Sequence, residues 1–132
     1  MGTKIRKNML GTEQIKQQFI NAAIINSEAS SSGDYKTANK QAKLLRDMLK
    51  NIENGKYDKN ILVELLNHKH VRVSGLAAID LLRIGHETNI AVETLKRITK
   101  MDESKMAVDE KLTVMAAKIQ LKSWIEKGYV SR

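Results

Sequence analysis

The fold is decided by one stretch, Val71-Arg-Val-Ser-Gly-Leu-Ala-Ala-Ile-Asp-Leu-Leu-Arg-Ile-Gly85, which is apolar nearly all round at helical length. At about 100° per residue, its charged side chains Arg72, Asp80 and Arg83 share one narrow strip, and apolar side chains occupy the remainder. Such a helix is stable only when neighbours cover it on at least two sides. We predict that it lies at the centre of the fold. Asp80 is expected to form an ion pair or a hydrogen bond there, because an unpaired buried charge is costly.

The composition of the chain favours an all-α protein. The 132 residues include no proline, one Phe, three Tyr and one Trp, whereas Ala, Leu, Ile, Lys and Gln are frequent. There is no cysteine, so a disulfide framework and a thiolate ligand are both excluded. The first ten residues lack the apolar segment of a signal peptide, and no apolar run reaches the roughly 18 residues of a membrane span. We predict a soluble, cytoplasmic protein that does not contact membranes.

Helix start and stop signals divide the chain into six helices. Each is expected to end at or near a glycine or a polar turn, because glycine readily adopts the left-handed conformation that closes a helix. Thr12 and Asp34 are the expected N-caps of the first two. The expected ranges are residues 12–32, 34–54, 60–67, 71–85, 88–101 and 107–127. Residues 1–11 are basic and are expected to form a flexible arm, followed by a single helical domain over residues 12–132.

Short loops join these helices in pairs, which predicts three stacked helical hairpins. Helix pairs that recur at intervals of roughly 30 to 45 residues are typical of HEAT and armadillo repeats, whose right-handed α-α superhelix offers a binding surface. The repeat in this chain is degenerate, so a compact six-helix bundle is the alternative.

Three segments resemble a known family. They are the turn Leu65-Leu-Asn-His68, the helix Val73-Ser-Gly-Leu-Ala-Ala-Ile-Asp-Leu-Leu-Arg-Ile84 and the final helix Ala117-Lys-Ile-Gln-Leu-Lys-Ser-Trp-Ile-Glu-Lys-Gly128. With them the chain resembles a small family of bacterial HEAT-like proteins of unknown function. Ser74 stands where that family has an arginine, and Lys118 where it has an acid. The resemblance implies a HEAT-like fold and an immunity role in polymorphic toxin systems, and it assigns no functional residue.

Lysines form the clearest surface pattern of the predicted helices. On the second helix they fall within about 80° of one another, opposite the apolar face, and on the last helix they share one meridian. These lysines are Lys36, Lys40, Lys43 and Lys50 on the second helix, and Lys111, Lys118 and Lys122 on the last. Lysines are common on helix faces that contact only water, and this is the first interpretation of the strips. With a net charge of +8, an acidic protein partner or a nucleic acid is the other. Because no aromatic residues accompany them, stacking of single-stranded nucleic acid is disfavoured.

The last helix has apolar residues in two separate arcs. One arc contains Leu112, Met115, Ala116 and Ile119, and the other contains Val114, Ala117, Leu121, Trp124 and Ile125. Either both arcs pack inside the fold, or Leu121 and Trp124 form a hydrophobic anchor for a partner, as aromatic hot spots do.

No group of residues in the sequence indicates catalysis. The three histidines have no third ligand at metal-binding spacing, the acid pairs have no nucleophile beside them, and no phosphate-binding glycine motif is present. We therefore predict neither an enzyme nor a cofactor nor a metal site. The prediction is a protein-binding module, an immunity protein that binds an acidic partner such as its cognate toxin through the lysines named above, Leu121 and Trp124. The alternative is a HEAT-like nucleic-acid-binding protein with a basic surface. The sequence does not indicate an oligomeric state.

Overall fold

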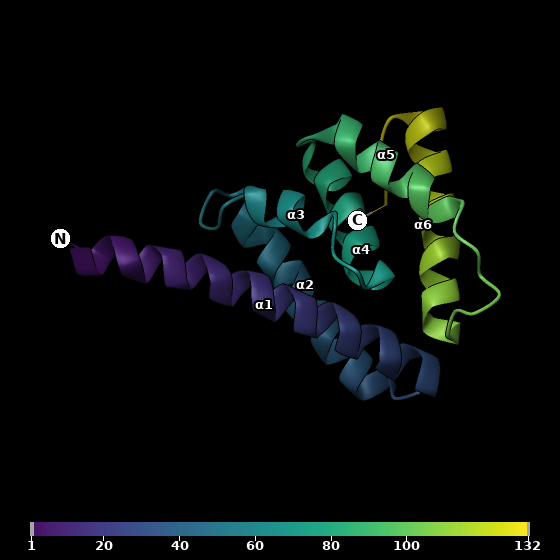
Figure 1. Cartoon of the computed structure of the whole chain (residues 1–132), viewed down its shortest axis with the longest axis horizontal. Helices are drawn as coiled ribbons and strands as arrows, with labels where there is room; N and C mark the ends of the chain where they lie inside the picture. The colour runs from purple at the N-terminus through teal and green to yellow at the C-terminus, as the bar shows by residue number, and fades with distance from the viewer. Residues whose placement is uncertain (1, 132) are drawn as a thin grey trace.

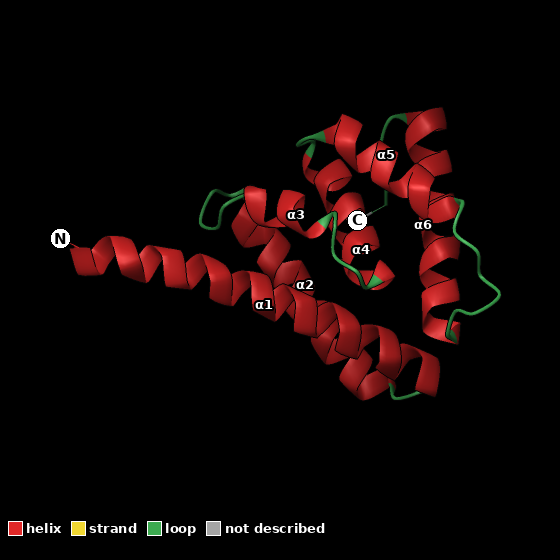
Figure 2. Cartoon of the chain, in the orientation of Figure 1, coloured by secondary structure: helices red, strands yellow, loops and turns green. Residues whose placement is uncertain are grey.

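The computed structural model describes residues 2–131 of the chain, and the side chains of residues 11–131. Within this part the regular structure consists of six helices without any strand, which confirms the predicted all-α class (Figure 2). None of these helices is both long and apolar enough to cross a membrane. The helices are α1 (Gly2–Ser32), α2 (Tyr35–Glu53), α3 (Asn60–Leu65), α4 (Val71–Ile84), α5 (Thr88–Thr99) and α6 (Val108–Lys127).

Helix α4 lies at the centre of the fold, as its apolar surface requires. Helices α1, α3, α5 and α6 all pack against it, and 11 of its 14 residues are buried (Figure 1). Its acid, Asp80, is 2% exposed and is paired with Arg83, whose Nη1 donates to Asp80 Oδ1 at 2.7 Å. The predictions of a central helix and of a satisfied Asp80 are both confirmed.

Both ends of α4 are closed by local interactions. At its start, Nδ1 of His70 accepts a hydrogen bond from the backbone N–H of Arg72 at 3.2 Å. At its end, Gly85 has a φ of 68°, in the left-handed region that only glycine adopts without strain. The central helix is thus bounded by an imidazole cap and a glycine stop.

Helices α1 and α2 form a hairpin around Gly33 and Asp34. Oδ1 of Asp34 accepts a hydrogen bond from the backbone N–H of Thr37 at 3.2 Å, as predicted for this N-cap. The buried residues of α2 are seven, three, one and three positions apart, which places them on one side of the helix, and α2 packs against α1. They are Ala38, Leu45, Met48, Leu49 and Ile52. The opposite side of α2 is therefore left to its lysines.

Helices α5 and α6 pack against each other and against α4, across the loop 100–107 (Figures 1 and 2). Helix α6 lies close to α4 at Gly75, where an added Cβ would lie 3.0 Å from Cγ2 of Thr113. A glycine in mid-helix thus allows α6 to lie directly on α4. This contact fixes which side of α6 faces the core.

The segment after α6 returns to the core. Gly128 ends α6 with a φ of 80°, and Val130 is buried. Nε of Arg83 donates to the backbone carbonyl of Ser131 at 2.8 Å, and Nε2 of Gln120 donates to Oγ of Ser131 at 2.6 Å. The C-terminal segment is therefore attached to both α4 and α6.

The predicted start of the first helix at Thr12 is wrong. Helix α1 begins at Gly2, because residues 2–10 are mostly helix formers and Gly11 is tolerated within a helix at a cost of about 1 kcal/mol. Its first turns extend beyond the other helices (Figure 1). The side chains of residues 1–10 lie outside the described part, so that the flexible basic arm over residues 1–11 stays a prediction.

Candidate functional site

The four predicted lysines of α2 are all exposed on its outer side. They are Lys36, Lys40, Lys43 and Lys50. Nζ of Lys43 lies 2.9 Å from Oδ2 of Asp47, and this contact lowers the pKa of the Asp47 carboxyl below its ordinary value. The strip is thus a solvated cationic face with one internal ion pair, and exposed pairs of this kind contribute little to stability.

The three predicted lysines of α6 are exposed as well. Lys111, Lys118 and Lys122 follow one side of the helix, and Nζ of Lys118 lies 3.7 Å from Oε2 of Glu103. Lys118 and Lys122 also border a shallow hollow of about 330 Å³ with Thr99 of α5. The α6 lysines therefore lie on the side of the helix that is next to α5.

Leu121 and Trp124 are only partly exposed. Both pack against the buried core, and Leu121 also lines the hollow that Lys118 and Lys122 border. Leu121 and Trp124 therefore contribute to the packing of α6 against the core, whereas the predicted anchor role requires exposed side chains. A partner contact by Leu121 and Trp124 stays a prediction.

Ile125, in the same arc as Leu121 and Trp124, is 66% exposed, but the continuous row of exposed apolar side chains on α6 belongs to the other arc. Thr113, Val114 and Ala117 are buried on the inner side of the helix. Four large apolar side chains follow the opposite side over three turns, which we call the outer stripe. Its members are Val108 (64% exposed), Leu112 (47%), Met115 (56%) and Ile119 (60%). Their spacing of four, three and four residues aligns them along one line of the helix.

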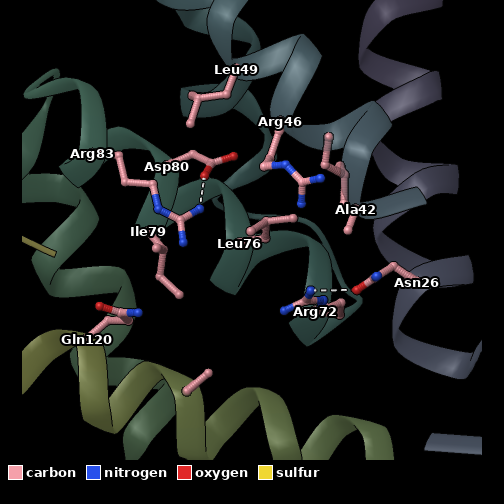
Figure 3. A pocket seen from close by; sticks show the side chains of 12 residues that line it. Asn26, Ala42, Arg46, Leu49, Arg72, Leu76, Ile79, Asp80, Arg83 and Gln120 are labelled. Atoms are coloured by element: carbon pink, nitrogen blue, oxygen red, sulfur yellow. Dashed lines mark hydrogen bonds and ion pairs between the residues drawn. The ribbon is translucent and has the colours of Figure 1, made fainter. Parts of the chain in front are cut away.

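The outer stripe has cationic groups along both of its edges. The α6 lysines follow one edge, on the side of α5. Beyond the other edge, Ala116 and Gln120 of α6 border a groove whose far wall is α2 (Figure 3). This groove, which we call the arginine groove, has a volume of about 260 Å³ and is lined by Arg46, Arg72 and Arg83.

The arginine groove combines an apolar wall with an excess of positive charge. Its apolar lining comes from α2 and α4, namely Ala42, Leu45, Leu49, Leu76 and Ile79. Asp80 is the one carboxylate among the described residues that line it, against three guanidinium groups. Figure 3 shows the side chain of Arg46, which belongs to α2, on the opposite side of the groove from the Asp80–Arg83 pair of α4.

Arg72 is the most enclosed of the three arginines. Its Nη2 donates to Oδ1 of Asn26 at 2.8 Å, while the buried Nε has no hydrogen-bond partner in the described part of the chain. Burial holds the pKa of this guanidinium below its ordinary value; Arg83 acts in the same direction, and Asp80 and Asp109 act against it. No carboxylate among the described residues lies within 4 Å of Arg72.

The lysine strips were predicted from the sequence, whereas the outer stripe and the arginine groove were not. The arcs of α6 were recognised, but the exposed one was not distinguished from the packed one. The groove joins residues that are far apart in the chain, since Asn26 and Arg72 are 46 positions apart. No helical periodicity signals such a contact.

No protein family, curated protein or solved structure matches this chain.

Proposed function

We propose that this chain is a non-catalytic protein-binding module that holds an acidic, amphipathic helix of its partner against the outer stripe of α6. The observation that carries the proposal is the row of four large apolar side chains at 47–64% exposure on one line of a well-formed helix. Contiguous apolar surface with a polar border is typical of protein interaction sites. Helix-in-groove and helix-on-helix recognition use anchors at the same spacing.

The charges along the two edges of the stripe favour an acidic partner over a second copy of the chain. Two copies paired antiparallel through the stripe would bring Lys111 and Lys118 of one copy close to the same lysines of the other, which is unfavourable. Glutamates and aspartates on a partner helix would instead face the α6 lysines on one edge and the arginine groove on the other. Such complementarity raises the association rate and the selectivity of binding.

The resemblance described above extends this proposal. It supports a HEAT-like stack of three hairpins as the finer description of the fold, and a cognate bacterial toxin as the partner. An immunity protein of this kind would act by covering or distorting the toxin. The basic strip of α2 supports the alternative, a nucleic-acid-binding surface, whose affinity would fall by roughly one power of the salt concentration per phosphate contacted.

A matched pair of isoleucine substitutions tests the proposal. Ile119 lies in the outer stripe and is 60% exposed, and Ile90 lies on α5 and is 47% exposed. Ile119→Glu and Ile90→Glu make the same chemical change on two exposed helix surfaces. Each tagged variant and the wild type would be used to recover partners from the native lysate at moderate salt, with and without nuclease.

We expect the wild type and Ile90→Glu to recover one near-stoichiometric protein that carries an acidic, amphipathic helix and survives nuclease. Ile119→Glu is expected to lose it, because a carboxylate would be buried at the interface without a partner. Recovery of nucleic acid, with proteins that disappear after nuclease treatment, would instead establish the alternative. If Ile119→Glu recovers the partner as well as the wild type does, the outer stripe is not the binding surface.

A further inference from the structure

We infer that the arginine groove is a separate ligand site, which binds a dianionic phosphoryl group between Arg46, Arg72 and Arg83. The groove lies between α2 and α4 and has a volume of about 260 Å³. Its three guanidinium groups face one carboxylate among the described lining residues, so two positive charges remain in excess. The inference assigns the groove a ligand of its own, in addition to its role as a positively charged border of the proposed partner surface.

The first reason is the state of Arg72. Removing a guanidinium from water is costly unless its donors are satisfied and its charge is compensated. Arg72 has one hydrogen bond to the neutral Asn26, no carboxylate within 4 Å among the described residues, and a buried Nε without an acceptor. A bound oxyanion would bring a negative charge closer to this guanidinium than those of Asp80 and Asp109, which act on it from beyond 4 Å.

The second reason is that two of the three arginines, Arg72 and Arg83, are held by hydrogen bonds. Nδ2 of Asn26 donates to the backbone carbonyl of Ala38 at 2.8 Å, which directs the Oδ1 of Asn26 to Arg72. The Arg83 guanidinium is held by Asp80 at 2.7 Å and by the carbonyl of Ser131 at 2.8 Å. Side chains that are already fixed lose less conformational entropy when a ligand binds.

The third reason is the match between the groove and the ligand. A phosphate monoester carries about −1.5 to −2 charges at pH 7, close to the two charges in excess, whereas a monocarboxylate carries one. The planar guanidinium group matches the oxygens of phosphate in a two-pronged geometry. Leu45, Leu76 and Ile79 add an apolar wall, which suits a phosphorylated compound with an apolar body.

Calorimetric titration at constant ionic strength, balanced with chloride, tests this site. The probes are inorganic phosphate and phenyl phosphate, with acetate as the monocarboxylate. We expect saturable binding of both phosphates to the wild type, tighter for phenyl phosphate, and no saturable binding of acetate. Absence of saturable phosphate binding, or equal binding of acetate, would overturn the inference.

Two variants of α2 show whether binding occurs in the groove. Arg46 is exposed at the groove, so Arg46→Gln removes one guanidinium without disturbing the core. Lys36→Gln removes a positive charge from the solvated side of the same helix. We expect Arg46→Gln to weaken phosphate binding by about tenfold, the effect of one charge-assisted hydrogen bond, and Lys36→Gln to leave it unchanged. Equal weakening by both variants would show that phosphate binding depends on the net charge of the protein alone, and would contradict binding in the groove.

Arg72→Lys provides a test that does not change the net charge. Lysine keeps the positive charge but lacks the planar pair of donors. We expect this variant to lose phosphate binding while retaining its helical circular dichroism spectrum. Should it fold poorly, the Arg46→Gln comparison still decides the question.

Discussion

Helices α4 and α6 both carry apolar side chains on more than one side, and their surroundings differ. On α4 the apolar side chains occupy nearly the whole circumference, whereas on α6 they form two separate arcs with lysines between them. Helix α4 is covered by four other helices of its own chain, whereas α6 is covered on its inner side alone, by α1, α4 and α5. Apolar side chains on more than one side of a helix thus predict that the helix is covered, without indicating which molecule covers it. For α6 we propose that a partner does so.

The charged residues of the two helices differ in the same way as their apolar residues. The acid of α4 is paired within the helix, Asp80 with Arg83 at 2.7 Å. On α6, Lys111, Lys118 and Lys122 lie in solvent along the edge of the outer stripe. The Asp80–Arg83 pair of α4 therefore stabilises the fold, and the lysines of α6 are available to a partner.

The largest expected difference between the two helices is in stability. Leu81 of α4 is fully buried, and its replacement by Ala leaves a cavity, so Leu81→Ala should lower the free energy of unfolding by about 2–5 kcal/mol. Ile119→Ala on α6 should change it by less than about 0.5 kcal/mol, because the side chain is already exposed. Urea denaturation followed by circular dichroism measures both. Similar losses in the two variants would mean that the outer stripe is already covered in the isolated protein.

The second expected difference is in the kinetics of partner binding. Reversal of the α6 edge with Lys118→Glu and Lys122→Glu should slow association by about tenfold and flatten its dependence on salt, since complementary charges act mainly on the association rate. The matched reversal on α2, Lys36→Glu and Lys40→Glu, should have a smaller effect. Surface plasmon resonance against the recovered partner separates the two. A larger effect on α2 would move the binding surface from α6 to the basic strip of α2.

The smallest expected effect concerns pH and the start of α4. Burial, with smaller contributions from His70 and Lys69, lowers the pKa of His68 below its ordinary value of 6.5. The unfolded chain therefore takes up this proton first as the pH falls, and stability present above about pH 6.5 is lost below it. Protonation of Nδ1 would also remove the acceptor for the backbone N–H of His70, now at 3.0 Å.

Urea denaturation at pH 7 and pH 5 measures the effect of His68 protonation on the free energy of unfolding. We expect the wild type to be less stable at pH 5, and His68→Gln to show a smaller decrease because it has no imidazole to protonate. The same decrease in both proteins would show that other groups are responsible.

Most of the fold could be predicted because its signals are local. Asp34 caps α2, and Gly85 ends α4 with the left-handed conformation that glycine permits. The start of α1 was missed because a Thr followed by an apolar periodicity is also found inside helices. The central place of α4 followed from the width of its apolar surface, which few arrangements can cover.

The candidate sites were predicted less completely, for a physical reason. The lysines of α2 could be placed in solvent from the sequence, because they lie on the side of the helix opposite its apolar face. On α6, two apolar arcs are equivalent until its contact with Gly75 of α4 is known, and this contact is long-range. The arginine groove depends on the same kind of information, because Arg46 and Arg72 belong to helices whose relative position is set by packing.

The most direct test of the account is a methyl NMR spectrum of the chain, with labelled Ile and Met, in the presence of its purified partner. We predict that the resonances of Met115 and Ile119 shift strongly and that those of Ile61 and Ile98, fully buried in the core, stay near their positions. Unchanged resonances of Met115 and Ile119 in a saturated complex would contradict the central claim that α6 is covered by its partner.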